Sequence, residues 1–251
     1  HTVQQLRKQF ADYAQENAFG KEPKELYEPL DYILAIGGKR MRPLLVMMAC
    51  NLFSDDITPS LAPAYGIELF HNFSLMHDDI MDAADLRRGK ATVHKQYDTN
   101  TAILSGDVML VYAYQYIGQV KPNLLSLVFK VFNETAIGVC EGQQMDMNFE
   151  QTMSVTIEEY IRMIELKTAV LVYGGMKIGA LVGGASEAEA DLVAAFGRNM
   201  GIAFQLQDDL LDTFGDAAKV GKRIGGDIVQ NKKTFLVLKT LELVDTQTRE
   251  M

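Results

Sequence analysis

The sequence predicts an all-α protein, and three observations point to that class. Apolar residues recur at helical spacing through most of the 251 residues, whereas alternating strand patterns are hard to find. Side-chain pairs that can cap a helix start recur three residues apart. Glycine and proline stand where the periodic segments end. We expect a single domain over residues 1–251, built as a bundle of roughly ten or more helices.

The N-terminal half is expected to hold helices over 2–18, 24–36, 40–53, 62–84 and 100–119. The first begins at Thr2, whose side chain can form a reciprocal capping box with Gln5. The second ends at Gly37-Gly38, because glycine readily adopts the backbone that closes a helix. Residues 54–63 contain two prolines and are expected to form a loop. Residues 67–81 are apolar nearly all round, which is typical of a central bundle helix.

The C-terminal half is expected to hold helices over 123–148, 156–182, 186–213 and 229–244. Lys121-Pro122-Asn123 separates the first of these from the preceding helix. Thr156 with Glu159, and Ser186 with Glu189, fit two further capping boxes.

Bulk composition excludes some functions. There are 24 Lys and Arg residues against 33 Asp and Glu, so the formal charge is −9 and general nucleic-acid binding is not expected. Cys50 and Cys140 form no disulfide framework, which favours a reducing cytoplasm. No signal peptide is visible. The most apolar stretch, 169–185, is interrupted by Lys177 and by glycines, so we expect no membrane span.

Two acidic clusters carry the strongest chemical signal. Asp78-Asp79-Ile80-Met81-Asp82 returns as Asp208-Asp209-Leu210-Leu211-Asp212. Since each helical residue turns about 100°, the three carboxylates of a cluster share one arc and repel one another unless a cation is present. Carboxylates without histidine or thiolate partners favour Mg²⁺, Mn²⁺ or Ca²⁺. One such cluster is usually a solvated helix face; two, both within apolar helices, predict a diphosphate held by several metal ions.

Cationic residues recur along the chain: Arg87 and Arg88 follow the first acidic cluster, and Lys222, Lys232 and Lys233 follow the second. Taken singly, each is more often a surface charge than a ligand, but guanidinium groups and helix N-termini bind phosphate well. The residues concerned are Lys39, Arg42, Arg87, Arg88, Lys167, Lys222, Lys232 and Lys233.

Several stretches, in order, resemble one known family. They are "GGKRMRP", "HDDIMDAADLRRG", "EGQQMD", "KT" at 167–168, and "FQLQDDLLDTFGD" followed by "GKRIGGDIVQNKKT". From Gly37 to about Lys239 the chain is similar to the trans-isoprenyl diphosphate synthases, or polyprenyl synthetases, of the short-chain type that makes geranylgeranyl or farnesyl diphosphate. The resemblance implies an isoprenoid-synthase bundle around a deep central cavity, a homodimer, and further helices beyond Met251. It also implies that isopentenyl diphosphate is joined head to tail to dimethylallyl, geranyl or farnesyl diphosphate.

The resemblance also implies a set of site residues. Three Mg²⁺ ions, replaceable by Mn²⁺, would be held by Asp78, Asp82 and Asp208, with Asp79, Asp209 and Asp212 supporting. Residues expected to act in catalysis are Asp78, Asp82, Asp208, Lys167 and Arg87. The allylic diphosphate would be held by Arg87, Lys167, Thr168, Gln205, Lys222 and Lys232. Isopentenyl diphosphate would be held by Lys39, Arg42, His71 and Arg88. Gln143 and Asp146 match the family pattern without a defined role, and the glycine-rich 214–234 stretch resembles a mobile lid.

Product length in this family is set below the first acidic cluster. Ser74 lies four residues before Asp78, or about 6 Å down a helix, and its small side chain would let a growing chain pass. Phe73 flanks it, and Phe70 lies about 12 Å down, so these rings would limit the chain. Similar family members with one aromatic residue five before the motif, and no two-residue insertion in it, often make twenty-carbon products.

Other functions remain as alternatives. A longer-chain polyprenyl synthase differs only in product. A class I terpene cyclase usually replaces the second acidic motif with a mixed Asn/Ser/Glu motif, which Asp208–Asp212 lacks. A phosphohydrolase of the HD type is prompted by His77-Asp78 but needs further histidine ligands, and the chain has four histidines in all. A non-catalytic synthase subunit typically loses one acidic motif, and both are intact here.

Overall fold

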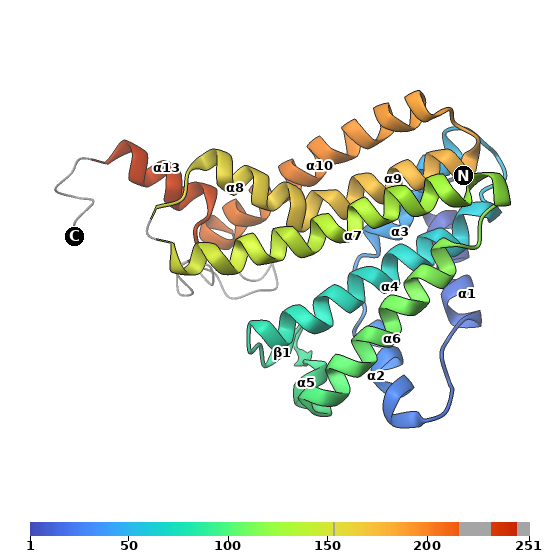
Figure 1. Cartoon of the computed structure of the whole chain (residues 1–251), viewed down its shortest axis with the longest axis horizontal. Helices are drawn as coiled ribbons and strands as arrows, with labels where there is room; N and C mark the ends of the chain where they lie inside the picture. Colours follow the sequence, from blue (N-terminus) through green and yellow to red (C-terminus); the bar gives the residue numbers. More distant parts are fainter. Residues whose placement is uncertain (153, 216–231, 245–251) are drawn as a thin grey trace. The chain divides into compact units, whose positions relative to one another are not determined.

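The computed structural model describes residues 1–152, 154–215 and 232–244, and it confirms the all-α class (Figure 1). Helices dominate, with one short hairpin between the fourth and fifth. The elements are α1 (Val3–Glu16), α2 (Lys24–Ile36), α3 (Met41–Asn51), α4 (Thr58–Met81), β1 (Leu86–Arg87), β2 (Lys90–Ala91), α5 (Val93–Gln96), α6 (Thr99–Ile117), α7 (Pro122–Gln151), α8 (Ile157–Ile164), the π-helical turn η1 (Glu165–Ala169), α9 (Val170–Gly183), α10 (Glu187–Phe214) and α13 (Phe235–Leu243).

The chain forms two compact units, and each is described by itself. The first consists of His1–Asn133 with Gly174–Ala194, and the second consists of the described residues of Glu134–Tyr173 and those from Ala195 onwards. Helices α7, α9 and α10 contribute residues to both units. The single domain and the central cavity expected from the sequence stay predictions.

In the first unit, α4 forms the centre of the core. Every residue from Ala62 to Phe70 is buried, but beyond Phe70 the predicted apolar stretch 67–81 buries only Asn72, Met76 and Asp79, so α4 is central in its middle and more accessible towards its acidic end. Glycine permits two of the closest helix contacts: a Cβ on Gly66 would lie 2.9 Å from the carbonyl oxygen of Ala113 in α6. A Cβ on Gly179 would lie 2.9 Å from the carbonyl carbon of Val46 in α3. The acidic end of α4 is therefore carried by a firmly held helix.

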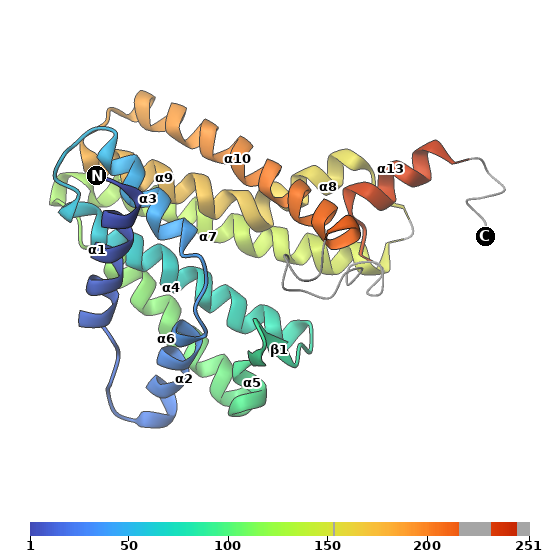
Figure 2. The same cartoon turned by 180° about the vertical axis from the view of Figure 1, so that it is seen from behind.

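In the second unit, parts of α7 and α10 run beside α8, η1 and α13, in both views of the structure (Figures 1 and 2). Its core includes the buried side chains of Tyr160, Met163, Ile164 and Leu238. Partly buried apolar residues of α10, among them Ile202 and Leu206, pack against this cluster. The apolar stretch around the second acidic cluster thus provides the packing face of α10.

The capping signals read from the sequence are confirmed. The amide of Gln5 donates to the Thr2 hydroxyl at 3.3 Å, and the amide of Thr2 donates back to the Gln5 side chain at 2.8 Å. Thr156 with Glu159 and Ser186 with Glu189 make the same reciprocal pairs. Helix α2 ends at Gly37, whose φ of 88° requires a residue without a Cβ.

Three expectations for the elements were wrong. The predicted loop over 54–63 is in part helical, because α4 begins at Thr58 and places Pro59 in its first turn, where no intrahelical amide bond is lost. The β1–β2 hairpin follows α4 where no strand was expected. The helix expected over 156–182 is divided by the π-helical turn η1.

Two helical stretches are long and apolar enough to cross a membrane by length and composition alone, Pro122–Gln151 and Ile157–Gly183. In the second, 67% of the most apolar window is buried inside the protein, as in a core helix. In the first the buried share is 33%, so α7 leaves more of its apolar side chains accessible.

Candidate active site

The first acidic cluster lies at the C-terminal end of α4 in the first unit. Asp78 and Asp79 belong to its last turn, and Asp82 is its C-cap. Asp79 is buried, with 4% of its side chain exposed, and receives both Nε and Nη2 of Arg87 at 2.8 and 2.7 Å. The same Nη2 lies 3.9 Å from Oδ2 of Asp78. One guanidinium therefore offsets the repulsion between two neighbouring carboxylates.

The short hairpin explains how Arg87 reaches Asp79. Leu86 and Arg87 pair with Ala91 and Lys90 in an antiparallel ladder, and the intervening Arg88 and Gly89 adopt positive φ angles of 52° and 77°. This tight turn folds the chain back on the end of α4, where the amide of Ala84 also donates to the carbonyl oxygen of Asp79 at 2.9 Å.

A second group of cations surrounds His71, which lies on α4. Nη1 of Arg42 lies 3.1 Å from Nε2 of His71. Burial, together with Arg42 and Arg88, holds the pKa of His71 well below its ordinary value of 6.5. The imidazole is therefore neutral, and because a guanidinium can only donate, Nε2 accepts and the proton resides on Nδ1. This arrangement leaves the positive charge on Arg42.

Two further arginines are fixed by nearby oxygen atoms. Arg40 donates to the Glu68 carboxylate and to the carbonyl oxygen of Leu34, and Arg88 donates to the carbonyl oxygen of Gly37. Sequence reasoning missed Arg40, although Glu68 within an apolar helix signalled that a cation must neutralise it. Lys39, between these arginines in the sequence, is exposed.

Because His71 is half-buried and neutral, we expect the protein to lose stability in acid. Because its folded-state pKa is depressed, the unfolded chain binds a proton below pH 6.5 that the folded chain does not, so stability falls as pH falls. We expect the free energy of unfolding to fall by about 1 kcal/mol more between pH 6.5 and 5.5 in the wild type than in His71→Gln. Urea unfolding of both proteins measures this difference, and carboxylate titrations common to both cancel. Equal pH slopes would contradict the neutral assignment.

In the second unit, the π-helical turn η1 carries Lys167 and Thr168. Nζ of Lys167 donates to Oδ2 of Asp146 at 2.6 Å, and Nζ of Lys232 lies 3.9 Å from the same oxygen. The Thr168 hydroxyl donates to Oε1 of Gln205 at 3.1 Å. Four polar residues expected around the allylic diphosphate or the cavity thus form two contacting pairs, Lys167 with Asp146 and Thr168 with Gln205, and Lys232 lies near Asp146. Lys222 and most of the expected lid lie outside the described residues.

The second acidic cluster lies near the C-terminal end of α10, and neutral donors hold its central aspartate. Asp209 is buried and accepts the hydroxyl of Tyr160, Nε2 of Gln205 at 3.0 Å and the amide of Phe235 at 3.4 Å. Burial raises the pKa of Asp209, although these hydrogen bonds oppose the shift. Asp212 is 9% exposed and Asp208 is half-buried. The clusters are alike in sequence, but Asp79 has a guanidinium partner, whereas the donors that the described part of the chain offers to Asp209 are all neutral.

The donor chemistry of the two clusters fits Mg²⁺. Among the described residues, no group of three or more His, Cys, Asp or Glu side chains is already arranged around an ion position. Mg²⁺ seldom needs such a cage, because it binds one or two carboxylates and completes its shell with water and phosphate oxygens. Asp79 and Asp209 already accept several hydrogen bonds, so their oxygens are oriented by protein donors.

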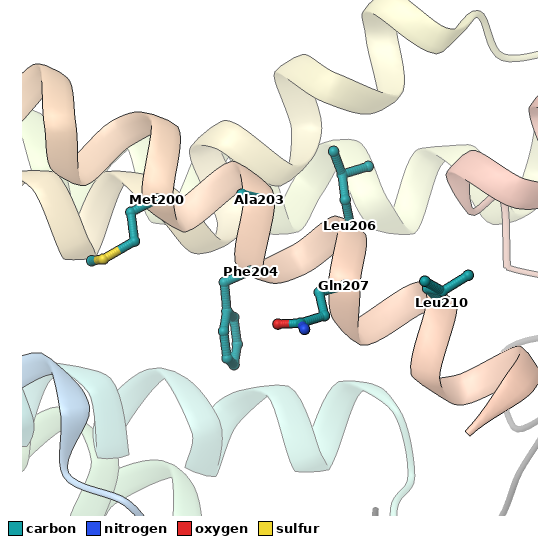
Figure 3. A pocket seen from close by; sticks show the side chains of 6 residues that line it. All are labelled: Met200, Ala203, Phe204, Leu206, Gln207 and Leu210. Atoms are coloured by element: carbon teal, nitrogen blue, oxygen red, sulfur yellow. The ribbon is translucent and has the colours of Figure 1, made fainter. Parts of the chain in front are cut away.

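An open pocket of about 600 Å³ borders the second acidic cluster on α10 (Figure 3). Figure 3 shows Phe204 and Gln207 projecting from one side of the helix and Leu206 from the other. The residues that line it are Met200, Ala203, Phe204, Leu206, Gln207 and Leu210. The lining residues therefore come from the turns of α10 immediately before and after Asp208, and most of them are apolar.

The residues predicted to set product length lie on α4 in the first unit. Phe70 is 1% exposed and its ring lies 5.4 Å from that of Phe132, so it belongs to the aromatic core. Phe73 is half-buried, with its ring centroid 5.5 Å from Phe70 and 4.8 Å from His77. Ser74 is also half-buried, and its hydroxyl donates to the carbonyl oxygen of His71 at 2.8 Å.

Known proteins resemble this chain over most of its length. The sequence profile of the polyprenyl synthetase family matches residues 23–251. A short chain isoprenyl diphosphate synthase of Methanocaldococcus jannaschii is 40% identical over 227 residues, which cover 90% of this chain and 69% of that protein. A geranylgeranyl diphosphate synthase of Methanosarcina mazei is 40% identical over 222 residues, covering 88% and 68%. The crystal structure of a geranylgeranyl pyrophosphate synthase matches with a TM-score of 0.94 and 48% identity, covering 96% of this chain and 74% of that one. This chain therefore belongs to the polyprenyl synthetase family and is a prenyltransferase.

Proposed function

We propose that this prenyltransferase joins isopentenyl diphosphate head to tail to an allylic diphosphate and that its product is geranylgeranyl or farnesyl diphosphate. Dimethylallyl, geranyl and farnesyl diphosphate are the candidate primers. The observation that carries the proposal is the pairing of carboxylates with cations in each unit, Arg87 at Asp79 and Lys167 at Asp146. Membership in the family and the geranylgeranyl diphosphate synthases among the similar proteins support the short-chain product.

The first chemical step breaks the bond between the allylic carbon and its diphosphate. Negative charge develops on the leaving group, and Arg87, Lys167 and Lys232 stabilise it, with Lys222 as a further expected ligand. Thr168 and Gln205 supply hydrogen bonds to the same group. Three divalent ions, held by Asp78, Asp82 and Asp208 with Asp79, Asp209 and Asp212 supporting, would add Lewis-acid stabilisation when bound.

The second step forms the new carbon–carbon bond with isopentenyl diphosphate. Arg42 remains charged beside neutral His71, and with Lys39 and Arg88 it provides cationic and donor groups for the second diphosphate. The condensed cation then loses a proton, for which the released diphosphate is a sufficient base. Apolar walls keep water from the cation, and aromatic faces stabilise it.

Product analysis tests this proposal. The purified chain is supplied with radiolabelled isopentenyl diphosphate, each of the three primers and Mg²⁺, and the dephosphorylated products are separated by chromatography. We expect C20 or C15 prenyl alcohols, no turnover with EDTA, and recovery with Mg²⁺ or Mn²⁺. Chains of C30 or longer would show a long-chain synthase, whereas cyclic hydrocarbons from the primer alone would show a terpene cyclase. No elongation with any primer would refute the proposal.

Phe73→Ala should lengthen the product by at least one five-carbon unit. The change removes a half-buried ring five residues before Asp78, so the growing chain meets less obstruction below the first acidic cluster. The product distribution of the variant is compared with that of the wild type by the same chromatography. Phe196→Ala, which removes a 63% exposed ring from α10, serves as the control and should leave the distribution unchanged. An unaltered product from Phe73→Ala would exclude Phe73 as the limiting side chain.

We also propose that the protein is a homodimer. Leu104 and Val111, seven residues apart on α6, are 58% and 64% exposed and present an apolar stripe. Leu125 of α7 adds a further exposed leucine, and α6 joins α7 through the rings of Tyr114 and Phe129 in the same unit. Sedimentation equilibrium should give twice the chain mass, and Val111→Glu should weaken association. A monomeric wild type at micromolar concentration would contradict this.

The cytoplasm remains the proposed location, because Cys50 and Cys140 are free thiols. Fractionation of native cells followed by immunodetection tests this, and recovery of the protein outside the cytoplasmic fraction would contradict it.

A further inference from the structure

The helix from α8 to α9 contains one turn of different geometry, which carries two of the residues expected to bind the allylic diphosphate. In η1 the amide of Val170 donates to the carbonyl oxygen of Glu165, five residues earlier, instead of four. A π-helical turn inserts one extra residue, is rare, and frequently occurs at functional sites. Here the inserted turn presents Lys167 and Thr168 to the two helices on either side.

On the α7 side, the contact depends on Gly142. A Cβ at this position would lie 2.6 Å from the carbonyl carbon of Leu166 and 2.7 Å from Cα of Lys167, closer than real Cβ atoms come. One turn further along α7, Asp146 accepts the Lys167 ammonium at 2.6 Å. The glycine thus brings the two backbones together, and the residue four positions later binds the side chain.

The α10 side repeats this arrangement. A Cβ at Gly201 would lie 2.7 Å from both Cα and Cβ of Ala169. One turn further along α10, Gln205 accepts the Thr168 hydroxyl at 3.1 Å, and its amide group donates to Asp209. A glycine followed four residues later by a polar side chain therefore occurs on both helices that flank η1.

We infer that Gly142 and Gly201 are positioning residues that hold Lys167 and Thr168 in place for the allylic diphosphate. We call Gly142 and Gly201, together with Asp146 and Gln205, the glycine clamp. The inference rests on the proposed function of Lys167 and Thr168. A methyl group on either glycine would displace the backbone of η1, because the atoms it meets are backbone atoms or the Cβ of Ala169, none of which can rotate away. A misplacement of about 1 Å can cost about 100-fold in rate.

The test is Gly142→Ala compared with Gly138→Ala. Gly138 lies one turn earlier on α7, and a Cβ there meets side-chain methyl groups of Val170 and Leu166 at 3.1 and 3.4 Å, which can adjust. We expect Gly142→Ala to raise KM for the allylic diphosphate at least tenfold and to lower kcat/KM for that substrate about 100-fold. KM for isopentenyl diphosphate should stay within about twofold of the wild type, and Gly138→Ala should stay within about twofold for every constant.

A KM that rises for the allylic diphosphate but not for isopentenyl diphosphate indicates a positioning role. Loss of folded protein would instead lower kcat and leave both KM values unchanged. Kinetic constants of Gly142→Ala equal to those of Gly138→Ala, or a fall in kcat alone in a Gly142→Ala protein that is fully folded by circular dichroism, would overturn the inference. Gly201→Ala gives the same test from the α10 side if Gly142→Ala does not fold.

If the wild type does not elongate any primer, the proposed function is refuted, and the role of the two glycines in placing η1 must be tested without kinetics. Crystal structures of Gly142→Ala or Gly201→Ala then decide the geometric part. A displaced η1 with a broken contact between Lys167 and Asp146, or between Thr168 and Gln205, supports the clamp. An η1 unchanged in both contacts overturns it.

Discussion

Asp208→Asn should lower kcat by about 100- to 1000-fold while leaving the protein folded. The change keeps the shape of the side chain and removes the charge through which the second acidic cluster would hold a divalent ion. Without that ion, the charge that develops on the leaving diphosphate loses one of its main stabilising groups. Steady-state kinetics at saturating Mg²⁺ and both substrates measures the effect.

Asp191→Asn provides the matched control for this prediction. Asp191 also lies on α10 and forms an ion pair with Lys177, but it is exposed and outside the acidic cluster. We expect its kcat to stay within about twofold of the wild type, since exposed ion pairs contribute little. If Asp208→Asn retained more than a tenth of wild-type kcat, Asp208 would not be a metal ligand in the reaction.

Arg87→Ala should lower the free energy of unfolding by about 3 kcal/mol as well as reduce activity. The truncation leaves the carboxylate of Asp79, 4% exposed, without the two hydrogen bonds that neutralise it. Breaking a buried pair by removing one partner costs more than the pair itself contributes, because the remaining charge stays desolvated. Urea denaturation followed by circular dichroism measures the change.

Two further variants make this prediction specific. The double variant Asp79→Ala/Arg87→Ala should regain most of the lost stability, because it leaves no unpaired buried charge. Lys95→Ala breaks the pair with Asp85, whose side chains are 47% and 79% exposed, and should cost less than about 1 kcal/mol. A loss below about 1 kcal/mol in Arg87→Ala would show that Asp79 is stabilised by other groups.

Most of the helices could be predicted because their signals are local. The capping residues Thr2, Thr156 and Ser186 specify a start within four residues of chain, and Gly37 specifies an end. The loop expected over 54–63 was wrong, because a proline in the first turn of a helix starts it as readily as it breaks one. Both the capping signals and the position of Pro59 act within one helical turn and do not depend on distant contacts.

The π-helical turn could not be predicted from periodicity. One extra residue barely changes a pattern averaged over three or four turns, and apolar residues continue on both sides of Lys167. What defines the turn is its contact with Gly142 and Gly201, which lie 25 and 34 residues away from Lys167. The glycines at 142 and 201 were the available sequence signal for this contact. A glycine within a helix lowers its stability, so its presence there usually reflects close packing against another backbone.

The sequence suggested which residues belong to the candidate site, but it did not show which side chains contact them. Five-residue motifs identified both acidic clusters, but nothing in them distinguishes Asp79, bound by Arg87, from Asp209, bound by Tyr160. Tyr160 lies 49 residues before Asp209 and belongs to a different helix. Such a pairing depends on tertiary packing, and a single sequence contains no local signal for it.

We expect the two acidic clusters to bind divalent ions together with an allylic diphosphate. Crystals grown with Mn²⁺ and a non-ionisable thiolo analogue of an allylic diphosphate test it through the anomalous scattering of manganese. We predict manganese peaks within about 2.5 Å of carboxylate oxygens of Asp78 or Asp82 and of Asp208, with the diphosphate completing the shells. Bound analogue with no manganese at either cluster would show that the acidic clusters are not the metal site.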